Sequence, residues 1–414
     1  MCKNKPYNPR ILFEICNVSD PFCIALVFSR NQYRYQTYAR QYSGALLAMH
    51  KQVVIFSPDW INLNNYLLTH YKNKAKHIKC YPIQETGETE AETTNLQLLI
   101  KYLKLSKSLH QAEKVMQTKI ECVFFAPVDD WIKPKFAKKI LKWAFNFKWS
   151  GLLINSDPYT QKKLKLNVDP KFGEPDYLLS AHNCISVATL NRYQSESIKS
   201  RVYKKVIVMP DISDNDLPGL QLKISKQIKL MAGNRMIVGT ILLENENPEN
   251  FLKVAASADS DKYFFVCAGV IEPVSLTQSA REALDKLLIS GKNNIYFILH
   301  NLEESESIND LLNAFDVCYL NDGNFKLPHP LLSKAAYFNK PVIGSKEDMI
   351  GKLLASFKTG IGVNGKVGES LDALNLLRMQ MPFENNFDLS KLQNYAKLQS
   401  KEALQEALEE LLTF

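Results

Sequence analysis

Long apolar runs are missing from this 414-residue sequence. No stretch of about 18 apolar residues occurs, so we expect no membrane-spanning segment. The first ten residues carry charges with no apolar stretch behind them, which argues against a secretory signal. Internal repeats and low-complexity segments are also missing. The 46% of hydrophobic and 23% of charged residues are typical of a globular protein, and the length fits two domains.

Paired cysteines are missing as well. The eight cysteines show no CxxC spacing, and several lie inside apolar runs such as Tyr263 to Cys267. This pattern indicates small buried residues in a reducing compartment rather than a disulfide framework. His70, His77 and Cys80 lie close in the sequence, but their spacing fits no standard zinc site. We therefore expect a cytoplasmic protein without a bound metal.

Positive charge exceeds negative charge, since 51 Lys and Arg face 43 Asp and Glu, a formal net charge of +8. Nucleic-acid binding would explain such an excess, but no recognition motif accompanies it, so we expect no nucleic-acid partner. Residues 99–119 are predicted to form a basic helix.

A second basic helix is predicted over 131–149, where Phe136, Ile140, Trp143 and Phe147 recur at helical spacing. Its lysines fall on another face. Two interpretations stay open: the helix lies peripherally on an anionic membrane surface, or its aromatic residues pack on a sheet and its lysines are solvated.

What the sequence does contain is an alternation of short apolar runs with segments of helical periodicity. Each run is long enough for one buried strand, and the alternation predicts parallel sheets covered by helices. The predicted strands are 11–16, 23–28, 53–56, 121–125, 152–154, 205–211, 236–243, 263–269, 294–300, 317–320, 341–343 and 359–363.

The most specific pattern lies between Val206 and Val363, and its clearest part begins at Leu311. A helix ends in Ala314-Phe-Asp-Val317 before an apolar strand, and Asn339-Lys-Pro-Val-Ile343 and Thr359-Gly-Ile-Gly-Val363 follow. This order resembles the nucleotide-sugar-binding half of GT-B glycosyltransferases of the family 4 type. The resemblance implies two Rossmann-like, doubly wound parallel-sheet domains that face a cleft, with the sugar donor held by the second.

Domain limits follow from composition and from the resemblance. The turn-rich segment 210–218 is typical of an interdomain linker. We expect an acceptor-side domain over 1–212, a nucleotide-sugar-binding domain over 213–385, and a last helix over 386–414 that crosses back to the first domain.

Several family positions carry other residues here. The family has two glutamates eight residues apart before the Lys-Pro-Val strand, and the matching positions are Lys326 and Lys334. The Arg and Lys that neutralise a leaving diphosphate are matched by Thr240 and Asn245. Either the two lysines rebuild a diphosphate site as catalytic cations, or they are solvated residues of a decayed site.

The resemblance also implies other donor contacts. Gly239 and Thr240 would allow a close backbone approach. Gly269 ends a strand, and two interpretations stay open: it lets the donor contact the backbone, or it is a plain turn glycine. Base contacts would come from His300 and Asn301. The start of the next helix would contribute Leu331 and Leu332.

Acceptor-side candidates lie in the first half of the chain. The turn after the strand 23–28 has no glycine and offers Arg30, Arg34 and Tyr35. Asp157 follows the strand 152–154 and is our candidate acceptor-side base, since ligands bind beyond the carboxyl ends of strands. An Asp before Pro is also common turn chemistry.

These observations favour a metal-independent glycosyltransferase that moves a sugar from a nucleotide-sugar to a glycan or lipid-linked acceptor in cell-surface polysaccharide or glycoconjugate synthesis. No cofactor is expected beyond the donor. The alternative is a catalytically inactive GT-B module that binds glycan or acts as a regulatory partner subunit. A nucleotide-sugar epimerase is disfavoured, because those enzymes also depend on acidic residues in the region of Lys326 and Lys334.

Overall fold

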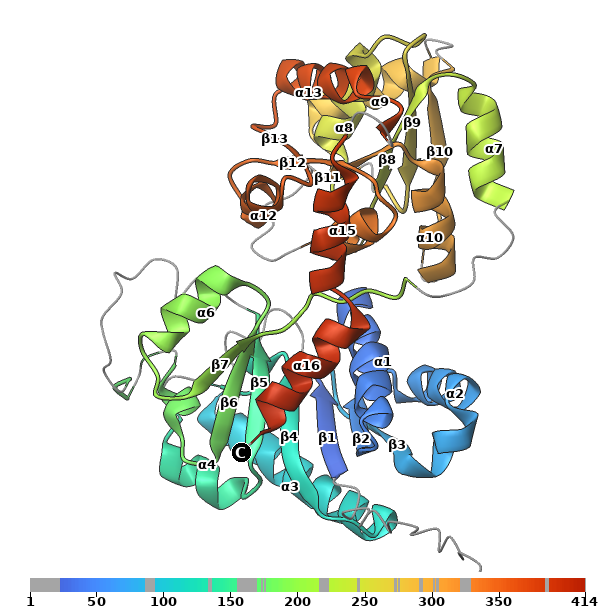
Figure 1. The fold of residues 1–414 in the computed structure, drawn as a ribbon. Helices are drawn as coiled ribbons and strands as arrows, with labels where there is room; N and C mark the ends of the chain where they lie inside the picture. The colour runs from blue at the N-terminus through green and yellow to red at the C-terminus, as the bar shows by residue number, and fades with distance from the viewer. Residues whose placement is uncertain are drawn as a thin grey trace, which may run out of the picture.

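The computed structural model contains two parallel sheets, each covered by helices on both faces (Figure 1). The predicted fold class is confirmed, whereas the predicted strand over 11–16 lies outside the described residues. The residues that the structure describes are 23–85, 94–132, 136–154, 170–172, 174, 176–215, 223–243, 246–271, 274, 276–289, 293–300, 302, 305–320, 329–383 and 387–413.

The first sheet has seven strands in the order β3-β2-β1-β4-β5-β6-β7, and every pairing is parallel. The strand order reverses direction between β1 and β4, as in a doubly wound domain. Its strands are β1 Cys23–Phe28, β2 Gln52–Ser57, β3 Ile78–Pro82, β4 Ile120–Ala126, β5 Trp149–Leu153, β6 Cys184–Thr189 and β7 Lys205–Val208.

The second sheet has six parallel strands in the order β10-β9-β8-β11-β12-β13, with its reversal between β8 and β11. The apolar runs predicted here as strands are strands in the structure. They are β8 Met236–Ile241, β9 Tyr263–Ala268, β10 Ile295–Ile298, β11 Val317–Leu320, β12 Val342–Ser345 and β13 Gly360–Val363.

Helices cover the first sheet on opposite faces. One face packs on α1 (Tyr33–Ala48), α2 (Trp60–His70) and the C-terminal helix α16 (Lys401–Leu412). The other packs on α3 (Asn95–Met116), α4 (Lys138–Ala144) and α6 (Arg192–Lys199). The basic helix predicted over 99–119 is therefore confirmed as α3.

The second sheet is covered in the same way. Helices α8 (Glu249–Ser257), α9 (Gln278–Ile289) and α13 (Val367–Met379) pack on one face. The other face carries five helices, which are α7 Lys223–Ala232, α10 Ser305–Ala314, α11 Pro330–Tyr337, α12 Met349–Phe357 and α15 Leu389–Leu398.

The C-terminal helix crosses back to the seven-stranded domain, as predicted (Figure 1). α15 packs on the second sheet, but Leu404, Leu408 and Leu411 of α16 are buried with the first domain's core. Ser186 of β6 donates a hydrogen bond from Oγ to the Leu411 carbonyl at 3.0 Å.

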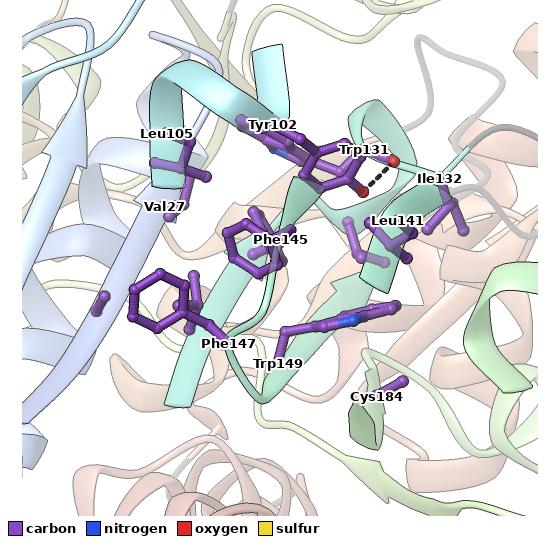
Figure 2. Packing of buried hydrophobic residues seen from close by; sticks show 14 of the residues in the cluster. Val27, Tyr102, Leu105, Trp131, Ile132, Leu141, Phe145, Phe147, Trp149 and Cys184 are labelled. Atoms are coloured by element: carbon purple, nitrogen blue, oxygen red, sulfur yellow. Dashed lines mark hydrogen bonds between the residues drawn. The ribbon is translucent and has the colours of Figure 1, made fainter. Parts of the chain in front are cut away.

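The prediction of one helix over 131–149 is wrong. Figure 2 shows the aromatic core that this segment builds against α3, where Tyr102 donates a hydrogen bond to the Trp131 carbonyl at 2.5 Å. Helix α4 covers only Lys138–Ala144, and β5 begins at Trp149. Phe136 and Phe147 flank the helix and are buried, so their spacing imitates helical periodicity. Ile140 and Trp143, which were expected on the same face, are 43% and 72% exposed.

Two further sequence expectations concern cysteines and membrane spans. Five of the six described cysteines are buried, as expected of small core residues. Within the described part of the chain, no helix is long and apolar enough to cross a membrane.

Candidate functional site

Each sheet reverses its strand order at one place, and ligands of doubly wound domains bind there, beyond the carboxyl ends of the strands. In the first sheet this switch point lies between β1 and β4. In the second it lies between β8 and β11. The segments that follow these four strands therefore define the candidate site.

The first switch point is bridged by a charge-assisted contact. Arg30, two residues after β1, donates from Nε and Nη2 to the two carboxylate oxygens of Asp130 at 3.0 and 2.6 Å. Ser29 Oγ donates to Asp130 Oδ2 at 2.7 Å. Asp130 ends the short turn Val128–Asp130 after β4, and the neighbouring Asp129 accepts from the Ile154 N–H at 2.7 Å. A bidentate pair of this kind fixes the two loops relative to each other.

The other acceptor-side candidates lie close to this bridge. The Arg30 guanidinium lies over the Tyr35 ring, 5.8 Å from its centroid. Burial raises the pKa of Tyr35 to about 12, although the charges of Arg30 and Arg34 oppose the shift. Its hydroxyl is therefore protonated at neutral pH. The third candidate, Arg34, lies in the first turn of α1, and its Nη2 is 4.0 Å from Oδ2 of Asp211.

The second switch point is bridged by His329 and Glu246. Glu246 follows β8, and its Oε2 accepts from the Leu243 N–H at 3.2 Å. His329 is the N-cap of α11, and its Nδ1 accepts from the Leu331 N–H at 3.1 Å. Because Nδ1 is an acceptor, the proton of the neutral ring is on Nε2, which donates to Glu246 Oε1 at 2.9 Å.

The first backbone N–H groups of α11 already have hydrogen-bond acceptors within the protein. Pro330 has no N–H, the Leu331 N–H is bonded to His329, and the Leu332 N–H is bonded to the His329 carbonyl at 2.9 Å. The side chains of Leu331 and Leu332 are buried in the core.

The remaining described donor candidates lie on β8 or just after β9 and β10. Gly239 and Thr240 are buried in β8, and a Cβ at Gly239 would come within 2.2 Å of the Phe315 ring, so this glycine has a packing role. Gly269 follows β9 with φ of +121°, a conformation that favours glycine. His300 is exposed after β10.

Lys334 is fully buried. Its amino group lies against the crossover, the segment after β7 that leads from the first domain to the second and is described over 209–215, rather than at the second switch point. Its Nζ donates to the Asp214 carbonyl and to Asn309 Oδ1, both at 2.6 Å. The Asp214 carboxylate accepts from Gln41 and, at 3.4 Å, from Arg40 of α1. Burial lowers the pKa of Lys334 to about 8, partly offset by the Asp214 charge.

Asp211 makes a second connection along the crossover. Its carboxylate accepts from the hydroxyl of Tyr38 in α1, and its N–H donates to Gln399 Oε1 at 2.6 Å. Burial raises the pKa of Asp211, an effect opposed by Arg34. Together with Lys334, these contacts join α1, the crossover, α11 and the C-terminal segment.

Four predicted site residues lie outside the described residues. They are Asn245, Asp157, Asn301 and Lys326. Within the described residues, no group of three His, Cys, Asp or Glu side chains is placed to hold a metal ion.

Sequence reasoning missed Asp130, Glu246 and His329. Asp129 and Asp130 lie four and five residues after the predicted strand 121–125, and two adjacent carboxylates beyond a strand end are a usable signal. The pairing of Glu246 with His329 had no such signal, because it depends on β8 and β11 being neighbours.

Comparison with solved structures identifies the architecture. The sucrose-phosphate synthase of Thermosynechococcus elongatus matches with a TM-score of 0.61 at 14% identity, over 94% of this chain and 98% of that one. Anabaena HepE in complex with UDP and glucose matches with a TM-score of 0.56 at 14% identity, over 94% and 99%. The chain has a GT-B fold.

The GT-B fold alone does not fix the reaction. A UDP-N-acetylglucosamine 2-epimerase also matches, with a TM-score of 0.54 at 11% identity over 95% of each chain. No protein-family model and no curated protein matches the chain. The reaction must therefore be argued from the site.

Proposed function

We propose that the protein is a glycosyltransferase that moves a sugar from a nucleotide-sugar donor to a glycan or lipid-linked acceptor in cell-surface polysaccharide or glycoconjugate synthesis. The GT-B neighbours support a nucleotide-sugar as donor, since HepE is seen with UDP and glucose. We place the reaction on the cytoplasmic side of the membrane and assign no metal to it.

The observation that carries the proposal is the pair of bridged switch points. Both sheets bring polar side chains across their strand reversal: Ser29 and Arg30 with Asp130 in the first, and Glu246 with His329 in the second. Purely structural loops could end in apolar packing, whereas these bridges hold charged groups where doubly wound domains bind ligands.

On the donor side, the proposed site centres on β8 and β11. Thr240, Gly269 and His300 lie on or just after the strands there, and Lys326 and Asn245 belong to the connecting segments. Lys326 is assigned to stabilise the departing diphosphate, since a fixed cation lowers the cost of the charge that develops on it. Asn301 is assigned to the nucleotide base.

On the acceptor side, the proposed site centres on Arg30, Arg34 and Tyr35. Asp157 is assigned as the base that accepts the acceptor's proton. Catalysis then rests on holding both substrates in one orientation. Lys334 contributes by fixing the crossover that sets this orientation.

A second candidate function, an inactive GT-B module that binds glycan or a partner subunit, is favoured by one observation. Glu246 brings a carboxylate to the N-cap of α11, close to where the family has its diphosphate-binding cations. A fixed negative charge there repels a diphosphate.

Thermal unfolding against a panel of UDP-, GDP-, CMP- and dTDP-sugars, with the free nucleotides, tests the donor assignment. A ligand at about 100 times its Kd raises the free energy of unfolding by about 2.7 kcal/mol. The transferase proposal predicts a rise with one nucleotide class and release of free nucleotide from its sugar form when acceptor glycans are added. Binding without release supports the inactive module. No rise with any nucleotide contradicts the donor assignment.

A further inference from the structure

The outer side of α3 and α4 exposes apolar side chains that the fold leaves uncovered. On α3, Leu96, Ile100 and Leu103 follow each other at steps of four and three residues and are 66%, 43% and 40% exposed. On α4, Ile140 and Trp143 are 43% and 72% exposed. The two helices pack against each other, so these side chains belong to one side of the first domain. Such gatherings on a soluble chain usually mark an interaction surface.

The same helices are strongly basic. Together α3 and α4 carry seven lysines and a single acidic residue, Glu113. Glu113 is 10% exposed, and its carboxylate is already bonded to His110, Lys119 and the Ile120 N–H. Five of the lysines are exposed and form no ion pair with any residue that the structure describes. They are Lys104, Lys107, Lys114, Lys139 and Lys142.

We propose that this surface of α3 and α4 binds an anionic lipid bilayer. Lysines near a bilayer are attracted by acidic headgroups, while Trp and aliphatic side chains enter the interfacial layer. Trp143 lies next to Lys142 and one turn from Lys139, so one short helix supplies both interactions.

A bilayer fits this surface better than an acidic protein does. The apolar side chains are interspersed with lysines along the outer sides of two helices, and a fluid headgroup layer accepts both kinds of side chain at once. A protein partner would need a matching groove, and it would exclude the lysines from the apolar centre of the contact.

The surface also has a suitable place in the molecule. α3 and α4 cover the face of the first sheet opposite α1 and α16, so bilayer contact leaves the interdomain connections uncovered (Figure 1). The Trp131 next to Asp130 of the first switch point packs on Tyr102 of α3. A membrane held at α3 and α4 therefore lies on the flank of the proposed acceptor side. The proposal itself stands without the transferase activity.

Vesicle sedimentation of the full chain tests it. Vesicles of phosphatidylcholine with about one third phosphatidylglycerol should pull the protein down at low salt. Pure phosphatidylcholine should not, because it lacks the negative charge, and added salt should weaken sedimentation because it screens the attraction. Lys139→Glu with Lys142→Glu should weaken binding at least about tenfold.

A matched control is available on α7 of the second domain, where Lys226, Lys229 and Leu230 are also exposed. Lys226→Glu with Lys229→Glu makes the same charge change as Lys139→Glu with Lys142→Glu, and it also places the change beside an exposed leucine. The control variants should bind as the wild type does. Equal weakening by both sets would overturn the assignment to α3 and α4, as would the absence of sedimentation with anionic vesicles.

Tryptophan fluorescence distinguishes a bilayer from an acidic protein. Trp131 and Trp149 are buried, whereas Trp143 is exposed, so vesicle binding should shift the emission to the blue. Trp143→Phe should remove most of this shift but keep the sedimentation. Sedimentation with anionic vesicles but without a blue shift would show that Trp143 stays outside the bilayer, and that result would overturn the proposal.

Discussion

The Lys334 amino group lies 2.6 Å from the carbonyl oxygen of Asp214, and this contact ties helix α11 to the crossover between the two domains. The same carbonyl accepts from Asn309 Nδ2 at 3.1 Å, while Lys334 also donates to Asn309 Oδ1 at 2.6 Å. These three groups form a closed, buried set. Lys334, which the sequence predicts at a glutamate position of the GT-B family 4 pattern, thus connects α11 to the segment between the domains.

A double-mutant cycle measures this set. Lys334→Met and Asn309→Leu should show a coupling of at least about 1 kcal/mol in urea unfolding, because each single change leaves a buried polar partner unpaired. Asn309→Leu combined with Lys139→Met, on the outer side of the other domain, should show additive effects. A coupling near zero for the first pair would contradict the contact.

The pKa of Lys334 predicts a pH dependence. Burial lowers it to about 8 from an ordinary 10.5, so between these values the unfolded chain holds a proton that the folded chain has released. The free energy of unfolding of the wild type, taken relative to Lys334→Met, should therefore rise as the pH increases through this range. The neutral amine of Lys334 still has two hydrogens, so it can keep both hydrogen bonds, to the Asp214 carbonyl and to Asn309 Oδ1. A difference that falls or stays constant from pH 7 to 10 would show that the group is not desolvated.

Arg201 and Asp176 form a buried ion pair in the first domain, with contacts of 2.5 and 2.8 Å. Burial raises the pKa of Asp176, and Arg201 opposes that shift. Arg201→Met should cost about 3–5 kcal/mol at pH 7, because it leaves an unpaired buried carboxylate. Adding Asp176→Asn should recover part of the loss. If the double variant is no more stable than Arg201→Met in denaturant unfolding, the loss is one of packing.

Gly239→Ala should destabilise the second domain by about 1–3 kcal/mol, since its Cβ meets the Phe315 ring at 2.2 Å. Phe315→Leu should relieve the clash, so the double variant should lose less than the sum of the single losses. Denaturant unfolding of the four proteins checks this. Full stability of Gly239→Ala combined with lost nucleotide binding would instead support the donor-contact role expected from the sequence.

Strands that are short apolar runs between turns were predictable from the sequence, as at Tyr263–Ala268 and Val342–Ser345. The edge strand β3 was not predicted, because it is not an apolar run and only Ile78 of its residues is buried. Helix limits were harder. The spacing of Phe136, Ile140, Trp143 and Phe147 predicts one helix, yet the chain leaves helical geometry after Ala144. Periodicity describes which residues could share a face, but it does not show where a strand such as β5 takes over.

The candidate site was only partly predictable for a related reason. Arg30 could be named because it lies two residues after a predicted strand, and it does lie at a switch point, with its guanidinium over the Tyr35 ring. The partner of Arg30 is Asp130, 100 residues away, and it becomes adjacent only because β1 and β4 pair. Lys334 was assigned as a donor-site residue by counting back from Pro341 in the sequence. Such a count does not show that the side chain is buried against Asp214.

We expect a nucleotide-sugar to bind at the switch point bridged by Glu246 and His329. Isothermal titration of the nucleotide found in the panel, into wild type and Glu246→Gln, measures this binding. The matched control is Glu282→Gln on the exposed side of α9. Removing the fixed negative charge while keeping a hydrogen-bond acceptor for His329 should tighten nucleotide binding several-fold, and the effect should shrink with added salt. Identical affinities for wild type, Glu246→Gln and the control would contradict this expectation.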